Sequence, residues 1–269
     1  MSTALRRLLA AALFACGLAL TAATAHAGRN CDAVQPPTAV NVQRAFDLAA
    51  RTATALDATG AQVVVLARSG QDLRKYGLRW SHLGFAYRDT TTPGNPWRVV
   101  HKLNACGSAR GDVHRQGLGE FFLDDLFRYE AAVVVPTAEV QTKLAALLAD
   151  DVAVATMHIP DYSMLAYPWA QRYQQSNQWA IETLAFAVEP GAGTRERAQA
   201  WLQFKGYEPT TLTISALTRL GARIGTANIA FDDHPSDKRY SDRIETVTVD
   251  SVFTWLERSG LGGPVKVLR

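Results

Sequence analysis

The chain has 269 residues, of which 48% are hydrophobic and 20% charged, a composition typical of a folded globular protein with one sizeable domain. It has 28 basic and 25 acidic residues, and two of the basic ones, Arg6 and Arg7, lie in an N-terminal segment that we expect to be cleaved. The mature chain therefore carries 26 basic against 25 acidic residues, a formal net charge of +1. A charge this close to zero argues against a global attraction to nucleic acid or to anionic membranes.

The first 27 residues have the features of a secretory signal peptide. Two arginines precede an apolar run over residues 8–23, and the small residues Ala25 and Ala27 stand where signal peptidase reads the chain. The run is shorter than the ~20 residues of a membrane-spanning helix, which favours cleavage over a retained anchor. We therefore expect a periplasmic or secreted protein of residues 28–269, with no membrane span after cleavage.

Apolar periodicity predicts helices and strands that are intermixed without regular alternation. Helices are expected at residues 42–56, 120–127, 138–148, from 176 onward, 195–204 and 251–258. Strands are expected at 62–70, 79–88, 97–104, 131–136 and 243–250, the second and third forming a hairpin around a turn at 90–96. The polar, glycine-rich residues 107–119 read as a loop. This order predicts one α+β domain, an antiparallel sheet with helices packed to one side.

The mature chain has two cysteines, Cys31 and Cys106. Two thiols in an oxidising compartment can form a disulfide, which here would tie the mature N-terminus to the body of the domain. The alternative is two separate thiols. Neither cysteine has the surroundings of a catalytic nucleophile.

The strand over 79–88 carries one imidazole among small neighbours, because His82, Gly84 and Ala86 share a face. Small neighbours leave room for another group to approach His82, as a general base requires. The alternative is a structural histidine, with Gly84 marking close strand packing.

His101 is a lone polar residue on an apolar face of the strand over 97–104. A histidine in such a place is most often a hydrogen-bonded core residue. In the predicted hairpin, however, His82 and His101 can lie on the same side of the sheet. His101 would then accept a hydrogen bond from the first ring and fix its tautomer, as the third member of a nucleophile–base–orienter triad does.

Ser176 opens a helix within a run of five uncharged polar residues, 174–178. A helix N-terminus favours developing negative charge, which helps to hold an oxyanion. A serine hydroxyl must still lose its proton to a base, and the alternative is that Ser176 only caps the helix. The preceding aromatics, including Trp169 and Tyr173, form either one wall of a substrate groove or part of the core.

Four stretches together, "RWSHLGFAYR", "HKLN", "FFLDDLF" and "YQQSNQWAIE", resemble a family of exported bacterial proteins, the domain of unknown function numbered 2145. This resemblance extends from about residue 45 to residue 260. The order of a strand histidine, a polar residue on the next strand and a residue opening a helix also resembles the circularly permuted papain-like superfamily. That superfamily includes NlpC-type peptidases and lecithin-retinol-acyltransferase-like proteins.

The papain-like resemblance implies a permuted papain-like core, with His82 as the base and His101 as the orienting residue. Ser176 falls where the superfamily has cysteine. The implied activity is that of an exported hydrolase or acyltransferase acting on an amide or ester bond. Its substrate would be a peptide, glycan or acyl compound of the cell envelope, such as cell-wall peptide.

In that mechanism, backbone N–H groups around Ser176 and Asn177 would stabilise the oxyanion, with Gln175 or Gln178 adding a side-chain donor. Because serine replaces cysteine, the alternative is a catalytically degenerate binding or accessory protein that uses the same cleft. The sequence has no phosphate-cradling glycine loop and no paired zinc-ligand motif, so we expect no cofactor and no metal. The acidic segment 231–242 is expected to be a solvated loop.

Overall fold

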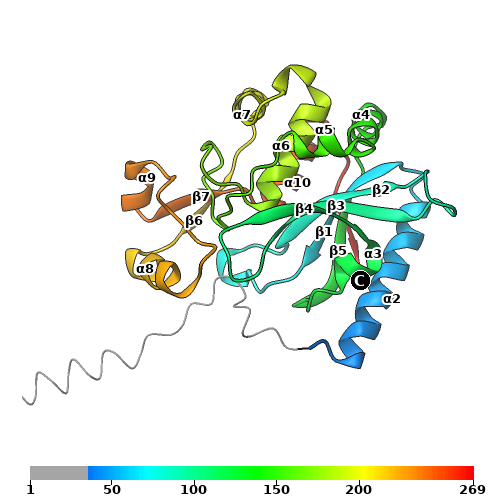
Figure 1. Ribbon diagram of the computed structural model, residues 1–269, viewed down its shortest axis with the longest axis horizontal. Helices are drawn as coiled ribbons and strands as arrows, with labels where there is room; N and C mark the ends of the chain where they lie inside the picture. The colour runs from blue at the N-terminus through cyan, green and yellow to red at the C-terminus, as the bar shows by residue number, and fades with distance from the viewer. Residues whose placement is uncertain (1–35) are drawn as a thin grey trace, which may run out of the picture.

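The computed structural model describes residues 36–269, and its centre is a six-stranded sheet with strand order β4-β3-β2-β1-β5-β8, in which every neighbouring pair is antiparallel. The strands are β1 (Val63–Ser69), β2 (His82–Arg88), β3 (Trp97–Asn104), β4 (Gly111–Gly117), β5 (Arg128–Val134) and β8 (Lys266–Leu268). The predicted α+β class, with an antiparallel sheet and helices packed against it, is confirmed. The helices cover both faces of the sheet and not one, as Figure 1 shows.

One face packs against α4 (Ala138–Leu148), α6 (Ser176–Val188) and α10 (Val249–Arg258), with α5 (Asp151–Ala155) and α7 (Arg195–Phe204) outside them. Leu83, Phe85 and Val100 of the sheet meet Trp179 and Leu184 of α6 in this core. Helix α6 is buried on nearly every side because it lies between the sheet and other helices.

The opposite face packs against α2 (Ala39–Asp57) and the short helix α3 (Leu118–Phe122). Leu66, Ala86 and Val99 contribute from the sheet, and Leu48 and Phe121 from the helices. Alternating side chains of one strand thus enter two different cores, and β1 is buried along its whole length because both of its faces are covered.

A smaller unit extends from the main sheet, at the left of Figure 1. It consists of β6 (Thr210–Thr213) paired with β7 (Arg243–Thr246), together with α8 (Ala216–Gly225) and α9 (Ser236–Tyr240), and it has an apolar cluster of its own. The expectation of a solvated loop at 231–242 is correct only in part: α9 within it has no buried residue, but His234 is buried and hydrogen-bonded to Asp233 at 3.0 Å and to the Glu245 carbonyl at 2.9 Å. Two 3-10 turns, η2 (Arg74–Tyr76) and η3 (Pro190–Ala192), complete the described elements.

The loop predicted at 107–119 is instead largely strand β4, which pairs with β3 from Asn104–Gly111 to Arg98–Gly117. Its polar side chains suit an outer strand, so no apolar alternation marks it in the sequence. Gly111 is needed where the chain turns into this strand, because a Cβ there would lie 2.8 Å from the Leu103 carbonyl oxygen.

Two predictions fall outside the described residues: the signal peptide at 1–27 and Cys31, whose pairing with Cys106 stays a prediction. Over residues 36–269, no helix combines the length and apolar character that crossing a membrane requires.

Candidate functional site

A chain of three hydrogen-bonded side chains crosses β2, β3 and β4. His82 Nε2 lies 2.8 Å from His101 Nδ1, and His101 Nε2 lies 2.9 Å from Gln116 Oε1. Gly84 faces His101 across the strands, and a Cβ at Gly84 would lie 2.8 Å from His101 Cβ. The small residue beside His82 therefore makes room for the second imidazole. The structure brings His82 and His101 together; the sequence reasoning missed Gln116.

The hydrogen bonds determine which ring nitrogens carry protons. Gln116 Oε1 accepts only, so His101 Nε2 is the donor and His101 Nδ1 is the acceptor. His82 Nε2 must then donate to His101 Nδ1, which leaves His82 Nδ1 as the unprotonated nitrogen of its ring. This is the tautomer that a histidine base needs.

The surroundings keep both rings neutral. Burial lowers the pKa of His82 well below its usual value, and the nearby Arg68 guanidinium and His101 lower it further. Burial and Arg68 also lower the pKa of His101 to about 3, although the Gln116 hydrogen bond raises it. Arg68 itself forms an ion pair with Asp124 and donates to the Phe121 carbonyl.

Ser176 does not join this chain. Its hydroxyl hydrogen bond goes to Tyr162, with 3.4 Å between Ser176 Oγ and the phenol oxygen, and none joins it to either imidazole. Ser176 is also not the cap of α6. Gln175 is the N-cap, and its side chain accepts a hydrogen bond from the Asn177 N–H.

Strand alternation explains why Ser176 and the imidazoles are separate. His82 and His101 point to the α3 face, where their ring centroids lie 6.0 Å and 5.2 Å from that of Phe121. Lys102, next to His101 in sequence, points to the α6 face, and its Nζ lies 5.8 Å from the ring centroid of Tyr162. Because Tyr162 is the partner of Ser176, the serine belongs to the layer on that second face.

The remaining polar residues at the start of α6 have structural partners. Gln175 donates to Thr246 and to the Val247 carbonyl, and Asn177 accepts from the Leu83 N–H at 3.1 Å, beyond the last β2–β3 pair. These side chains join the start of α6 to β2, to the last residue of β7 and to the residue that follows it.

Glu182, one turn and a half further along α6, is the centre of a buried polar cluster. It accepts hydrogen bonds from Arg195 and from three carboxamides, those of Gln174, Gln178 and Gln199. The run of polar residues that marked this helix in the sequence is thus largely a set of buried hydrogen-bonding groups.

Lys102 extends the same cluster toward β3. Its Nζ donates to the Ile159 carbonyl at 2.6 Å and to Gln174 Oε1 at 2.9 Å, and the side chain is fully buried. Burial, together with the nearby Arg195 guanidinium, lowers the pKa of Lys102 to about 7, although Glu182 opposes the shift.

The two aromatics for which the sequence left a groove wall or a core position open are both half-buried. Trp169 packs against the α6-side core, with its ring centroid 6.0 Å from that of Tyr207. Tyr173 is half-buried, and the Arg172 guanidinium lies 5.1 Å from its ring centroid. Within residues 36–269, no group of three or more histidine, cysteine or acidic residues is arranged to hold a metal ion.

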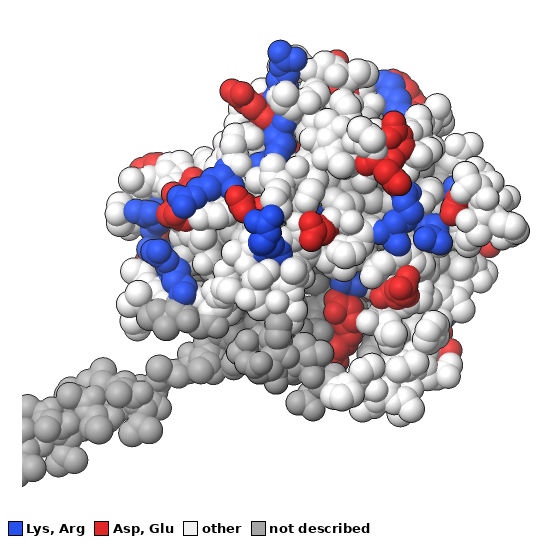
Figure 2. Space-filling view, in the orientation of Figure 1, with Lys and Arg blue, Asp and Glu red and all other residues white. Residues whose placement is uncertain are grey.

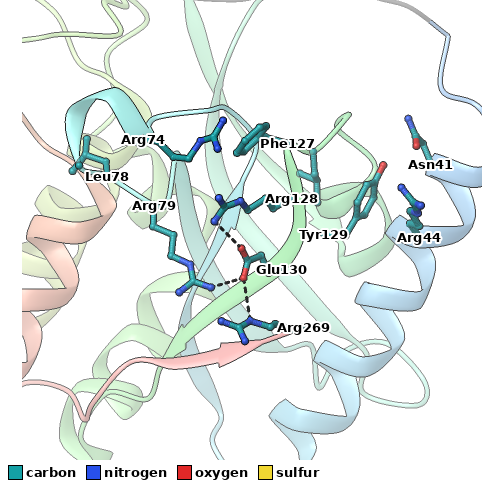
Figure 3. A pocket seen from close by; sticks show the side chains of 12 residues that line it. Asn41, Arg44, Arg74, Leu78, Arg79, Phe127, Arg128, Tyr129, Glu130 and Arg269 are labelled. Atoms are coloured by element: carbon teal, nitrogen blue, oxygen red, sulfur yellow. Dashed lines mark hydrogen bonds and ion pairs between the residues drawn. The ribbon is translucent and has the colours of Figure 1, made fainter.

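The surface mixes charges: on the face shown in Figure 2, basic side chains lie beside acidic ones. A different arrangement occurs in an open cavity of about 930 Å³, which we call the arginine pocket. Its lining residues are Asn41, Arg44, Arg74, Gly77, Leu78, Arg79, Leu126, Phe127, Arg128, Tyr129, Glu130 and Arg269. Figure 3 shows Arg79, Arg128 and Arg269 converging on Glu130. The sequence analysis did not find this pocket.

Comparison with known proteins gives one family match. A family model described as an uncharacterized protein conserved in bacteria, DUF2145, matches residues 55–256. Neither the curated proteins nor the solved structures that were searched gave a match.

Proposed function

Because this chain belongs to the DUF2145 family, whose description names no activity, we propose its function from its own geometry: a non-catalytic binding or accessory protein of the bacterial cell envelope. The observation that carries the proposal is the position of Ser176. Its hydroxyl bonds to a buried phenol and to neither imidazole, and the residue is only 5% exposed.

A serine nucleophile needs a base within hydrogen-bonding reach, because its own pKa lies far above neutrality. Tyr162 does not meet this need, since burial raises the pKa of its phenol and keeps it protonated. His82 is engaged with His101 instead. A substrate carbonyl would also have to reach a hydroxyl that the surrounding side chains cover. These facts favour the degenerate alternative over acyl transfer.

A permuted papain-like origin and export are parts of the same proposal. The chain order His82, His101, Ser176 and the start of α6 at Ser176 support the first. The separation of Ser176 from both imidazoles by the sheet departs from a papain-like site and fits only a degenerate one. The leader at residues 1–27 supports the second. In an exported protein we expect Cys31 and Cys106 to form a disulfide. Non-reducing peptide mapping of the exported protein would show the Cys31–Cys106 linkage, or two free thiols if this part is wrong.

The test of the central proposal uses Ser176→Cys, which supplies the thiol that papain-like enzymes have at the start of their catalytic helix. A thiol-directed electrophile should label this variant no faster than Ser163→Cys, a buried serine in the same segment. The label should not change when His82→Ala is added. Rapid labelling that depends on His82 would show that His82 can act as the base for a nucleophile at position 176. It would overturn the proposal in favour of hydrolysis or acyl transfer.

A second readout uses the native side chain. Wild type and Ser176→Ala should hydrolyse an activated ester, such as p-nitrophenyl acetate, at the same low rate. A Ser176-dependent rate with a burst of product would contradict the binding role.

A further inference from the structure

We propose that the arginine pocket binds an organic anion carrying two or more phosphate or carboxylate groups. This inference deepens the proposed binding function, because it names a place and a ligand class. The pocket is distinct from the histidine chain and from Ser176, whose residues are not among its lining.

Charge is the first argument. Arg74 is neutralised by Asp72, to which it forms two side-chain hydrogen bonds of 2.8 Å and 2.6 Å. The other four arginines face a single lining acid, Glu130. Four arginines against one carboxylate leave an excess of three positive charges among the lining side chains. A dianion would neutralise most of this excess.

The availability of the guanidinium groups is the second argument. Arg44 forms no ion pair within the described residues; its guanidinium carbon lies 5.8 Å from the ring centroid of Tyr129. Arg128 and Arg269 each reach Glu130 only at 3.5 Å, while 41% and 78% of their side chains stay exposed. Planar guanidinium groups bind carboxylates and phosphates through paired N–H donors, so these three arginines can add a ligand anion to their present contacts.

Glu130 gives the third argument, because it preorganises the site. Its side chain is 10% exposed and holds Arg79, Arg128 and Arg269 together, although they come from distant parts of the chain. Burial alone would raise the pKa of Glu130, but the three arginines lower it and keep the carboxylate charged. Holding the arginine side chains near one another before binding lowers the entropic cost of ligand binding.

Aromatic residues indicate that the ligand is organic and not a simple inorganic ion. Phe127 is 40% exposed, and the guanidinium carbons of Arg74 and Arg128 lie 5.2 Å and 5.3 Å from its ring centroid. Tyr129 presents a second ring beside Arg44 (Figure 3). The cavity volume of about 930 Å³ lies in the range of small-molecule sites. A ring or apolar portion would pack here while its anionic groups meet the arginines.

The experiment is isothermal titration calorimetry on the full mature protein with three probes, and with inorganic phosphate as the reference for the third. Pyrophosphate tests the phosphate arm, citrate tests the carboxylate arm, and phenyl phosphate tests the contribution of a ring. We expect pyrophosphate or citrate to bind, with an affinity that weakens as salt rises. Phenyl phosphate should bind at least threefold more tightly than inorganic phosphate.

The decisive variants are Arg44→Gln and Arg128→Gln, each of which should weaken probe binding about tenfold, the equivalent of about 1.4 kcal/mol. Arg51→Gln is the matched control, because Arg51 is an exposed arginine on the same helix as Arg44 and does not line the pocket. Its affinity should stay within twofold of wild type. Arg44 has no ion pair to lose among residues 36–269, so its variant should fold normally.

Absence of binding by all three probes would overturn the pocket, as would equal losses in Arg44→Gln and Arg51→Gln. These results are separable from a failure of the proposed function. His82-dependent labelling of Ser176→Cys would refute the non-catalytic role and leave the anion site standing. Unreactive Ser176→Cys without anion binding would refute only the pocket.

Discussion

Glu182 provides the sharpest test of how this fold is stabilised. Its carboxylate is fully buried and accepts hydrogen bonds from Arg195 at 2.8 Å, Gln174 at 2.6 Å and Gln199 at 2.7 Å, with a longer one from Gln178. Glu182→Ala removes every one of these acceptors. It leaves a buried guanidinium without its anion and three carboxamide groups without a shared partner.

The magnitude follows from those contacts. Removing one partner of a buried ion pair costs about 3–5 kcal/mol, because the remaining charge is uncompensated. Arg195 keeps three backbone carbonyl acceptors, those of Ala170, Gln171 and Tyr173, which soften the loss. We therefore expect about 3–5 kcal/mol in the free energy of unfolding. For a domain of this size, that lowers Tm by roughly 6–20 °C.

Urea unfolding followed by circular dichroism measures this difference, with Glu257→Ala as the control. Glu257 is exposed on α10, and its loss should change the free energy of unfolding by no more than about 0.5 kcal/mol. Glu182→Gln, which retains one acceptor oxygen, should fall between the two. Thermal unfolding gives the matching Tm values, and a Glu182→Ala variant that melts within 2 °C of the Glu257→Ala control would show that the cluster does not stabilise the fold.

Three further predictions concern the sheet. Gly84→Ala should lower the free energy of unfolding by about 1–3 kcal/mol, because its new methyl group would lie 2.8 Å from His101 Cβ and from the Val100 carbonyl oxygen. The control is Gly221→Ala, at a helical position of α8 with open space around it, which should be neutral or stabilising in the same urea assay. Lys102 has a lowered native pKa of about 7, so above that pH the unfolded chain binds a proton that the native state has lost. Stability should therefore rise between pH 7 and 9, by at most about 1.4 kcal/mol per pH unit, and a Lys102→Met variant with an unchanged slope in urea melts would contradict this. The native pKa of His101, about 3, lies below its unfolded value, so stability is lost as pH falls below about 6.5. NMR should show a His101 ring that stays neutral at pH 5, and His101→Gln should lose less stability between pH 6.5 and 4; a ring that titrates near pH 6 would refute the assigned environment.

Local patterns were enough to predict much of the fold. The helix at 138–148, the helix at 195–204 and the strand at 97–104 have the predicted bounds, and the hairpin of β2 and β3 is confirmed. Each of these segments carries its apolar periodicity within its own residues. Strand β8 pairs with β5 through only three residues, a signal too short to recognise in the sequence.

The candidate site required information that one sequence does not contain. Alternation places His82 and His101 on a common side once their strands pair, and the sequence showed that much. The face of the sheet that α6 covers depends on tertiary packing. The hydrogen bond between Ser176 and Tyr162 could therefore not be predicted from the local sequence. The near-neutral total charge also concealed the arginine pocket, because Arg44, Arg128 and Arg269 come together only in the folded chain. The alternation of aromatic and basic residues at Phe127, Arg128 and Tyr129 is the local feature of the sequence that could have indicated an anion-binding site.

The order of strands in the main sheet bears on how this protein meets other molecules. Strand β4 lies at one margin and carries Asp112, His114 and Arg115, while β8 lies at the other, is three residues long and includes Lys266. Long, flat, apolar edge strands favour the addition of a strand from a second chain, whereas short or charged edge strands disfavour it. The sheet is therefore a poor template for intermolecular β-pairing. Recognition by this protein is expected to depend on its side chains and not on backbone pairing.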